Sequence, residues 1–314
     1  MYILGLDIGG TKCAAITGEW DGENITLIKK SVCKTDLSIN AEDMLDRLFS
    51  AAEEILDKKP DSIGISCGGP LDSQKGLIMS PPNLPGWDAV EIVRLTEERF
   101  SATAHLQNDA NACAMAEWKF GAGRGCDNVV FLTFGTGLGA GLILNGRLYE
   151  GTNGNAGEVG HIRLAKDGPI GFGKHGSFEG FCSGGGIARL GATMAHEALE
   201  NGIRPIYCNA EEISAKTIAE AANMGDKTAI EVYRTSGRYL GRGLSIIVDI
   251  LNPERIIIGG VYARSGHLMC ESANEEMRKE ALAESLSCSQ IVPAELGEEI
   301  GDYAALATAL ITKE

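Results

Sequence analysis

The stretch Asp7-Ile8-Gly9-Gly10-Thr11 is a glycine-rich turn between two apolar runs, residues 2–6 and 13–17. A second turn of this kind, Phe134-Gly135-Thr136-Gly137-Leu138-Gly139, follows the apolar run 129–132. Short apolar runs bounded by glycines are typical of buried strands. The chain therefore contains the same unit twice, a strand followed by a glycine turn and a further strand.

Each unit ends in a dipeptide that indicates a hairpin. Asp21-Gly22 lies 10 positions after Thr11, and Asn145-Gly146 begins 9 positions after Thr136. Both dipeptides favour type I′ turns, in which the two central residues need positive φ. The repetition predicts two similar halves whose glycine turns face each other and hold a phosphate chain from both sides.

The composition indicates a globular protein of about two domains. No apolar run approaches the roughly 20 residues of a membrane span, and the N-terminus lacks the basic and apolar segments of a signal peptide. The 9 cysteines are scattered and never spaced as C-x-x-C, which favours reduced thiols. We therefore expect a cytoplasmic protein that has no membrane partner.

The formal net charge of −15, from 43 acidic and 28 basic residues, limits the possible partners. A surface this acidic repels nucleic acids and anionic lipids at long range. Any phosphate group must be held locally, by backbone N–H groups or by a metal ion. We expect small-molecule partners and no nucleic acid.

The order of the remaining patterns indicates an α/β layered protein. A helix is predicted over 41–57, because Ala41, Leu45, Leu48, Ala52 and Ile55 recur at helical spacing. Further strands are predicted at 25–29, 62–66, 105–107, 255–260 and 290–294, and further helices at 88–100, 110–119, 184–200, 212–223, 226–250, 265–283 and 302–312.

Two glycine-rich segments interrupt this order. Gly121 to Gly125 indicate a hinge, because the second hairpin unit begins just after them. Residues 151–186 are rich in glycine and show little periodicity. A loop this long is uncommon in a compact domain unless it is functional or mobile.

The two glycine turns are candidate phosphate sites. Glycines let backbone N–H groups converge on anionic oxygens, and Thr11, Lys12 and Thr136 add side-chain donors. Asp7, at the end of a strand, suits Mg²⁺ held through water. Either turn alone is explained by a tight turn, but the matched pair favours phosphate binding.

Asn108-Asp109 precedes a predicted helix and supports two interpretations. Asp109 could accept a proton from a substrate hydroxyl that attacks phosphorus. Asp and Asn are also the preferred N-cap residues of helices. The residues alone leave both roles open, and one residue can serve both.

The remaining candidates are each open to a plain structural explanation. Glu158, His161 and Glu179 are natural partners for sugar hydroxyls, or they are solvated loop charges. Asn83 lies among prolines, where Asx residues usually form turns. Gly259-Gly260 could let an adenine ring pack on the backbone, or could form an ordinary strand-to-helix turn.

Taken together, these segments resemble the ROK family (repressor, open reading frame, kinase) of the actin-like sugar kinase superfamily. The resemblance covers the whole chain and keeps the order of the motifs. The matching segments are Leu6-Asp7-Ile8-Gly9-Gly10-Thr11, Gly69-Pro70-Leu71-Asp72, Asn83-Leu84-Pro85-Gly86-Trp87, Asn108-Asp109-Ala110-Asn111, Thr133-Phe134-Gly135-Thr136-Gly137-Leu138-Gly139, Ala156-Gly157-Glu158-Val159-Gly160-His161 and Ile257-Ile258-Gly259-Gly260.

The resemblance implies an α/β actin-like ATPase (ribonuclease H-like) fold, with a duplicated sheet-and-helix unit around a central cleft. It implies a first domain of residues 1–120 plus 299–314, a second of residues 121–298, and a homodimer. The implied activity is transfer of the ATP γ-phosphoryl group to a hexose hydroxyl with Mg²⁺, glucose or an N-acetylhexosamine being the expected substrate.

The resemblance also assigns roles to residues. Asp109 is implied as the general base. The implied sugar-binding residues are Gly69, Asn83, Asn108, Asp109, Glu158, His161 and Glu179. The implied ATP-binding residues are Asp7, Gly9, Gly10, Thr11, Lys12, Gly135, Thr136, Gly137, Gly259 and Gly260, with Asp7 holding Mg²⁺ through water.

One segment departs from the family pattern. ROK kinases usually bind zinc with a histidine and three cysteines, and this chain carries Ile170, Phe172 and Ser177 where those cysteines would lie. Zinc cannot be held by His161 with an aliphatic, an aromatic and a hydroxyl side chain. We predict no structural zinc. Packing of Ile170, Phe172 and Phe178 is expected to hold the loop, and His161 keeps its sugar-facing role.

Two other functions remain open, a sugar-responsive repressor of the same family and a sugar-binding protein without catalysis. Family repressors carry a winged helix-turn-helix ahead of the first phosphate motif, whereas Asp7 lies near the start of this chain. The acidic surface also disfavours DNA binding. An intact Asp109 and both glycine turns favour the kinase.

Overall fold

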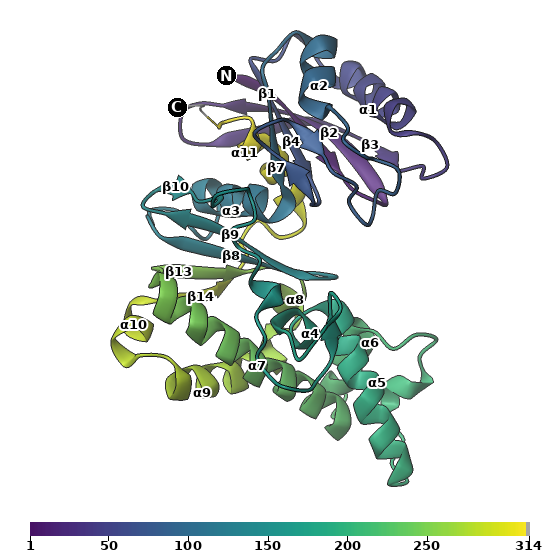
Figure 1. Ribbon diagram of the computed structural model, residues 1–314, viewed down its shortest axis with the longest axis vertical. Coiled ribbons are helices and arrows are strands. Elements are labelled where there is room, and N and C mark those ends of the chain that lie inside the picture. Colours follow the sequence, from purple (N-terminus) through teal and green to yellow (C-terminus); the bar gives the residue numbers. More distant parts are fainter. Residues whose placement is uncertain (312–314) are drawn as a thin grey trace.

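The computed structural model describes residues 1–311, which form two five-stranded sheets (Figure 1). The strands of the first sheet are β1 (Tyr2–Ile8), β2 (Lys12–Trp20), β3 (Ile25–Lys34), β4 (Ser62–Cys67) and β7 (Ala104–Asn108). Those of the second are β8 (Val129–Phe134), β9 (Leu138–Leu144), β10 (Arg147–Leu148), β13 (Arg255–Ile258) and β14 (Gln290–Pro293). Two short hairpins pair β5 (Leu71–Asp72) with β6 (Leu77–Ile78), and β11 (Ile170–Gly171) with β12 (Lys174–His175).

The two sheets have the same topology. Their strand orders are β3-β2-β1-β4-β7 and β10-β9-β8-β13-β14. In each, the first strand pairs with its hairpin partner in antiparallel fashion and with the next long strand in parallel fashion. The duplicated unit predicted from the sequence is confirmed, and it extends to five strands in each half.

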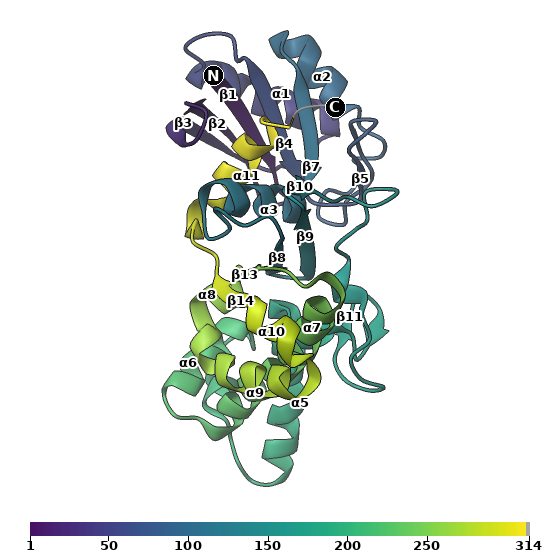
Figure 2. The ribbon, with the colours of Figure 1, turned by 90° about the vertical axis from the view of Figure 1, so that its left-hand side faces the viewer.

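The helices form three layers around the sheets (Figures 1 and 2). Two cover the outer face of the first sheet, two lie between the sheets, and the others cover the far face of the second sheet. In that order they are α1 (Ala41–Ile55) and α2 (Ile92–Phe100); α3 (Asp109–Phe120) and α11 (Ile300–Thr308); and α4 (Phe178–Phe181), α5 (Gly184–Glu200), α6 (Ala215–Asn223), α7 (Lys227–Leu251), α8 (Val261–Ser265), α9 (Cys270–Glu280) and α10 (Ala283–Cys288).

The central layer depends on small residues. A Cβ on Gly64 of β4 would overlap the backbone carbonyl oxygen of Ala305 in α11, and one on Gly5 would lie 2.9 Å from the Cβ of Ala305. A Cβ on Gly141 of β9 would likewise lie 2.5 Å from the Cβ of Ala114 in α3. These glycines let both helices rest directly on the strands.

Only one of the two predicted hairpin turns has the expected geometry. Asn145 and Gly146 both have positive φ, 53° and 70°, as a type I′ turn requires. At the first turn only Gly22 has positive φ, because the Asp21 carboxylate accepts the N–H groups of Glu23 and Asn24 at 2.8 Å. This Asx turn makes a longer connection, so the prediction for Asp21-Gly22 is wrong in turn type.

Several predicted helix boundaries shift where a local partner competes with the helix. The helix predicted from residue 88 begins at Ile92, because Val90 forms a β-bridge with Ile78. The helix predicted from residue 212 begins at Ala215, because Ser214 and Thr217 form a capping box.

The single helix predicted over 265–283 is also wrong. Met269 leaves helical geometry with a φ of −128°, and Ala281 is extended, so the segment forms α8, α9 and α10 with a 3₁₀ turn between the first two. The last helix runs from Ile300 to Thr308, whereas it was predicted over 302–312. The predicted end of this helix, Thr312, lies outside the described residues, as do the last three residues of the predicted first domain, 312–314.

Within residues 1–311, none of the helices combines the length and the hydropathy that a membrane crossing needs.

Replacing Gly64 with alanine tests the close packing of the central layer. Because the added Cβ overlaps backbone rather than a movable side chain, we expect the free energy of unfolding to fall by about 1–3 kcal/mol. Urea unfolding measures this. Gly139→Ala is the matched control, since a Cβ there would lie 3.5 Å from its nearest neighbour. Equal stabilities of the two variants would contradict the packing argument.

Candidate active site

Three parallel strands of the first sheet end at one edge, and two predicted site residues lie there. Ile8 of β1 is in register with Cys67 of β4, and Cys67 is in register with Asn108 of β7. Asp7 and Asp109 therefore lie near each other, and their charges interact. The carboxyl ends of parallel strands are where α/β proteins place ligands.

Asp7 lies within a group of carboxylates. Burial, with the negative charges of Asp302 and Asp109, raises the pKa of Asp7 from 3.8 to about 6, although Lys12 and Lys30 act in the opposite direction. Asp302 is in the first turn of α11, and its Oδ2 lies 2.6 Å from Lys30 Nζ. The sequence offers no sign of Asp302, because it is nearly 300 positions from Asp7.

The N-terminus of α3 separates the two roles that the sequence left open. Asn108 is the N-cap, and its Oδ1 accepts the N–H of Asn111 at 2.8 Å. Asp109 occupies the first helical position, where its Oδ1 accepts the N–H of Ala110 at 2.8 Å. The capping explanation therefore applies to Asn108, and the Asp109 carboxylate is available for other chemistry.

The surroundings of Asp109 indicate a recess. Burial raises the pKa of the Asp109 carboxyl, the N–H of Ala110 lowers it, and the charge of Glu158 raises it. The side chain is nevertheless exposed to solvent. A carboxylate that contacts solvent while protein surrounds it on most sides lies in a hollow, and Glu158 is near enough for its charge to act on Asp109.

The first glycine turn connects β1 to β2 and is held by Thr35, the residue that follows β3. The N–H of Gly9 donates to the carbonyl of Lys12 at 3.1 Å, and Thr35 Oγ1 donates to the carbonyl of Gly9 at 2.6 Å. The side chains of Thr11 and Lys12 are exposed. Thr35 is missing from the predicted site, because no local pattern distinguishes it from other threonines.

The second glycine turn connects β8 to β9 in the same way. The N–H of Gly135 donates to the carbonyl of Gly137 at 3.1 Å, and Thr133 Oγ1 accepts the N–H of Gly139 at 3.0 Å. The side chain of Thr136 is exposed. Each turn thus has one threonine that holds the backbone and another that faces solvent.

Two more glycine segments pack against the second turn. A Cβ on Gly260, whose φ is +61°, would overlap the carbonyl oxygen of Phe134, and Gly259 continues the hydrogen bonding to β8. Gly184, at the start of α5, donates its N–H to the carbonyl of Gly135 at 2.7 Å. The predicted adenosine segment therefore contacts the second phosphate turn, and Gly184 is an addition that the sequence analysis does not single out.

Asn83 joins the first turn to the loop that follows β4. A Cβ on Gly10 would overlap the backbone of Asn83, and one on Gly68 would lie 3.6 Å from both Asn83 Oδ1 and Nδ2. The Asn83 side chain is exposed, and Gly69 has open space where a Cβ would lie. These residues place the predicted sugar segments beside the first phosphate turn.

Glu179 and His161 lie on the second half. Glu179 Oε2 accepts the N–H of Leu138 at 3.1 Å, so this carboxylate lies against the second phosphate turn. The ring of His161 instead meets Phe172 edge-on, with 5.1 Å between the ring centroids. Glu158 therefore interacts with Asp109 by charge alone, whereas Glu179 contacts the second glycine turn and His161 contacts the loop.

The loop around residues 165–177 is not held as predicted. Phe178 is fully buried, but Ile170 is 41% exposed and Phe172 is 72% exposed. Both lie at the β11–β12 hairpin, whose two turn residues, Phe172 and Gly173, have positive φ of 42° and 75°. A hairpin tip of this geometry projects into solvent, so packing by Ile170 and Phe172 is a wrong prediction.

Polar contacts hold this hairpin instead. Ser177 is buried, caps α4 by accepting the N–H of Gly180 at 3.1 Å, and lies at one of the missing cysteine positions. Lys174 Nζ donates to the carbonyl of His161 at 2.7 Å. Residues 1–311 contain no group of three or more His, Cys, Asp or Glu side chains arranged to hold a metal ion.

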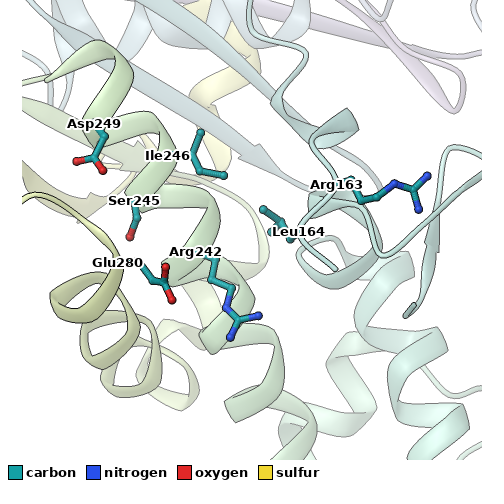
Figure 3. A pocket seen from close by; sticks show the side chains of 7 residues that line it. All are labelled: Arg163, Leu164, Arg242, Ser245, Ile246, Asp249 and Glu280. Carbon is teal, nitrogen blue, oxygen red and sulfur yellow. The ribbon is translucent and has the colours of Figure 1, made fainter. Parts of the chain in front are cut away.

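A surface cavity of about 340 Å³ lies away from these residues, along α7 (Figure 3). None of the predicted site residues lines it. Its charged groups are already engaged in part, since Arg242 Nε lies 2.6 Å from Glu276 Oε1. The lining residues are Arg163, Leu164, Arg242, Ser245, Ile246, Asp249 and Glu280.

Comparison with known proteins gives consistent matches over the whole chain. The model of the ROK family matches residues 3–311. A glucokinase from Thermotoga maritima is 30% identical, and the alignment covers 100% of this chain and 98% of that protein.

Solved structures of a kinase and of a transcriptional regulator are both similar to this chain. A ROK family glucokinase from Streptomyces griseus, in complex with glucose and AMPPNP, is 30% identical with a TM-score of 0.78, covering 98% of this chain and 99% of that one. A ROK family transcriptional regulator, a homologue of the Escherichia coli MLC protein, is 27% identical with a TM-score of 0.86. The match covers 98% of this chain and 77% of that chain. The actin-like ATPase fold expected from the resemblance is confirmed.

Asp7→Asn tests the electrostatic state of the site. A carboxyl whose pKa is about 6 in the folded protein and 3.8 when unfolded is costly to ionise in the folded state. The wild type therefore loses stability as the pH rises from about 4 to about 6, and the variant lacks this loss. We expect the variant to melt roughly 2–4 °C higher than the wild type at pH 8, with little difference at pH 4. A variant that melts lower at pH 8 would show that Asp7 is stabilised as an anion.

Proposed function

The chain belongs to the ROK family, and we propose that it is an ATP-dependent hexose kinase. One observation carries the proposal. Asp109 interacts by charge with Asp7, beside the first phosphate turn, and with Glu158 of the sugar segment. A general base for phosphoryl transfer to a sugar must lie near both the phosphate chain and the attacking hydroxyl, and the interactions of Asp109 with both segments support this role.

Asp109 acts as the general base. As the sugar oxygen bonds to the γ-phosphorus of ATP, the bond from phosphorus to the β–γ bridging oxygen breaks, ADP leaves, and the hydroxyl proton passes to the carboxylate. The raised pKa of Asp109 suits this role, because a base with a pKa nearer to neutrality accepts a proton more readily.

The glycine turns hold the phosphate chain. The backbone N–H groups of Gly10 and Gly137 and the side chains of Thr11, Lys12 and Thr136 approach it from both halves. Gly9 and Gly135 shape the two turns, because their own N–H groups donate within the turn. Gly259 and Gly260 are the proposed adenosine contacts, and their lack of side chains lets this segment pack against Phe131 and Phe134 beside the second turn. The similar glucokinase that binds AMPPNP supports the use of ATP.

Asp7 fits a Mg²⁺ ion held through water. The repulsion of Asp7 by Asp109 and by Asp302 favours a cation at this edge of the sheet. Because residues 1–311 provide no group of three metal-binding side chains, phosphate oxygens and water would complete the shell, as Mg²⁺ usually requires. When bound, the ion would neutralise charge on the phosphate oxygens.

The sugar lies between the halves. Its hydroxyls contact Asn83, Asn108, Glu158, His161 and Glu179, with Gly69 leaving space for the ring. Glucose or an N-acetylhexosamine is the proposed substrate, and the similar glucokinase that binds glucose supports a hexose. We further propose that the two domains, residues 1–120 with 299–314 and residues 121–298, close over the substrates to exclude water. We also propose that the protein is a homodimer and lies in the cytoplasm.

A sugar-binding regulator without catalysis is the alternative, since one of the similar structures is a transcriptional regulator. The acidic balance of the chain, −15, disfavours DNA binding by the chain itself. Sugar-dependent release of ADP from ATP separates the two functions. The kinase predicts turnover with at least one hexose, and the regulator predicts sugar binding alone.

Asp109→Asn tests the base. The amide cannot accept the proton, so kcat is expected to fall by about 10²–10⁴-fold, while sugar binding stays detectable by calorimetry. Asp57→Asn is the control, because Asp57 lies on the surface and pairs with Lys29. Turnover by Asp109→Asn at the wild-type rate would overturn the assignment.

The proposed absence of structural zinc has its own test. Metal analysis of the purified protein should find far less than about one zinc per chain, and a chelator should leave its melting temperature unchanged. Hydrogen bonds of Ser177 and Lys174 hold the loop that zinc holds in other family members. A stoichiometric zinc content would contradict this.

A further inference from the structure

Glu150 follows β10 and connects three segments of the candidate site. Its Oε1 accepts a hydrogen bond from Ser73 Oγ at 2.9 Å and one from Gln107 Nε2 at 2.7 Å. Its backbone carbonyl accepts the N–H of Ala156 at 3.1 Å. One residue therefore joins the β5–β6 hairpin, the end of β7 and the loop that leads to Glu158.

Gln107 connects Glu150 to the start of α3. Gln107 is 3% exposed. Its Oε1 accepts a hydrogen bond from the backbone N–H of Asn108 at 3.1 Å and another from Asn111 Nδ2 at 3.2 Å. An ionised carboxylate only accepts hydrogen bonds, so Glu150 obliges Gln107 to present Nε2 to it. The Gln107 oxygen must then face the two donors beside Asp109.

The opposite orientation of Gln107 is unfavourable. It would direct the Nε2 group at the N–H of Asn108 and the amide of Asn111, which are both donors. Asn111 is 1% exposed, and its Oδ1 has no hydrogen-bond partner within residues 1–311. A buried network that already contains one unpaired acceptor is strongly destabilised when further hydrogen bonds are lost.

We propose that Glu150 is a positioning residue for phosphoryl transfer, acting through Gln107 and Ala156. It holds the base, Asp109, and the sugar-binding Glu158 in one arrangement across the two sheets. The inference rests on the proposed kinase function and assigns a role to a residue outside the motifs. A displacement of about 1 Å at such a site lowers the rate by up to about a hundredfold.

An exchange of the two side chains tests this role. Gln107→Glu places two carboxylates in contact, and we expect kcat for the sugar to fall by about 10–100-fold. Glu150→Gln keeps an acceptor oxygen for both donors, Ser73 Oγ and Gln107 Nε2, and its kcat should fall by less than about threefold. The double variant restores a donor–acceptor pair with reversed roles, so its kcat should recover to within about threefold of the wild type.

Hydrogen exchange supplies a readout that needs no activity. In Gln107→Glu, backbone amides of residues 107–112 and 150–158 should exchange at least about tenfold faster, because the network that protects them is broken. The double variant should restore their protection. Glu19→Gln is the matched control, since Glu19 is exposed and its nearest cation, Lys58, is 4.0 Å away.

The outcomes separate this inference from the proposed function. Wild-type kcat and protection in Gln107→Glu, or a double variant as impaired as Gln107→Glu, would overturn the positioning role. A lowered melting temperature with unchanged kcat would show a structural role alone and also overturn it. If the wild type shows no sugar-dependent ADP release, the kinase proposal and the catalytic part of this inference both fail. The exchange experiment then decides whether Glu150 joins the segments.

Discussion

The close contact of α3 and α11 with the two sheets is the constraint on which the site depends. Gly5 and Gly64 let α11 rest on the first sheet, and Gly141 lets α3 rest on the second. The first turn of α11 therefore brings Asp302 to Asp7, and the N-terminus of α3 brings Asp109 to the same edge. Any side chain at those glycines would move the carboxylates that the proposed chemistry uses.

The charge distribution follows from this packing. The negative charges of Asp302 and Asp109 act on Asp7 near the end of β1, and Lys12 and Lys30 act in the opposite direction. Such an arrangement is unfavourable in an empty site and favourable when a cation and phosphate groups occupy it. In the proposed function, a protein with a net charge of −15 would bind anions locally, through glycine turns and a metal ion, while its surface as a whole repels them.

Symmetry between the halves does not extend to the connections between them. The second half carries the long glycine-rich segment, in which buried Ser177 takes a cysteine position and the hairpin tip, including Phe172, projects into solvent. Between the sheets, the halves share the apolar core that surrounds α3 and α11. Outside that layer, Glu150 makes a polar connection, since its partners Ser73 and Gln107 belong to the first half.

The sequence by itself determined the features that depend on neighbours along the chain: both glycine turns, the repeated strand pattern and the buried face of α1. It also indicated Asn108 and Asp109, but only the start of α3 assigned the cap to one and left the other available. Asp302, Thr35 and Glu150 have no local signature, because Asp7, Gly9 and Gln107, with which they interact, are 26 to nearly 300 positions away and only packing brings them together. The exposure of Ile170 and Phe172 was likewise decided by the tertiary structure. Apolar residues predict burial only where a surface is present to cover them, and this hairpin is covered too little to bury either side chain.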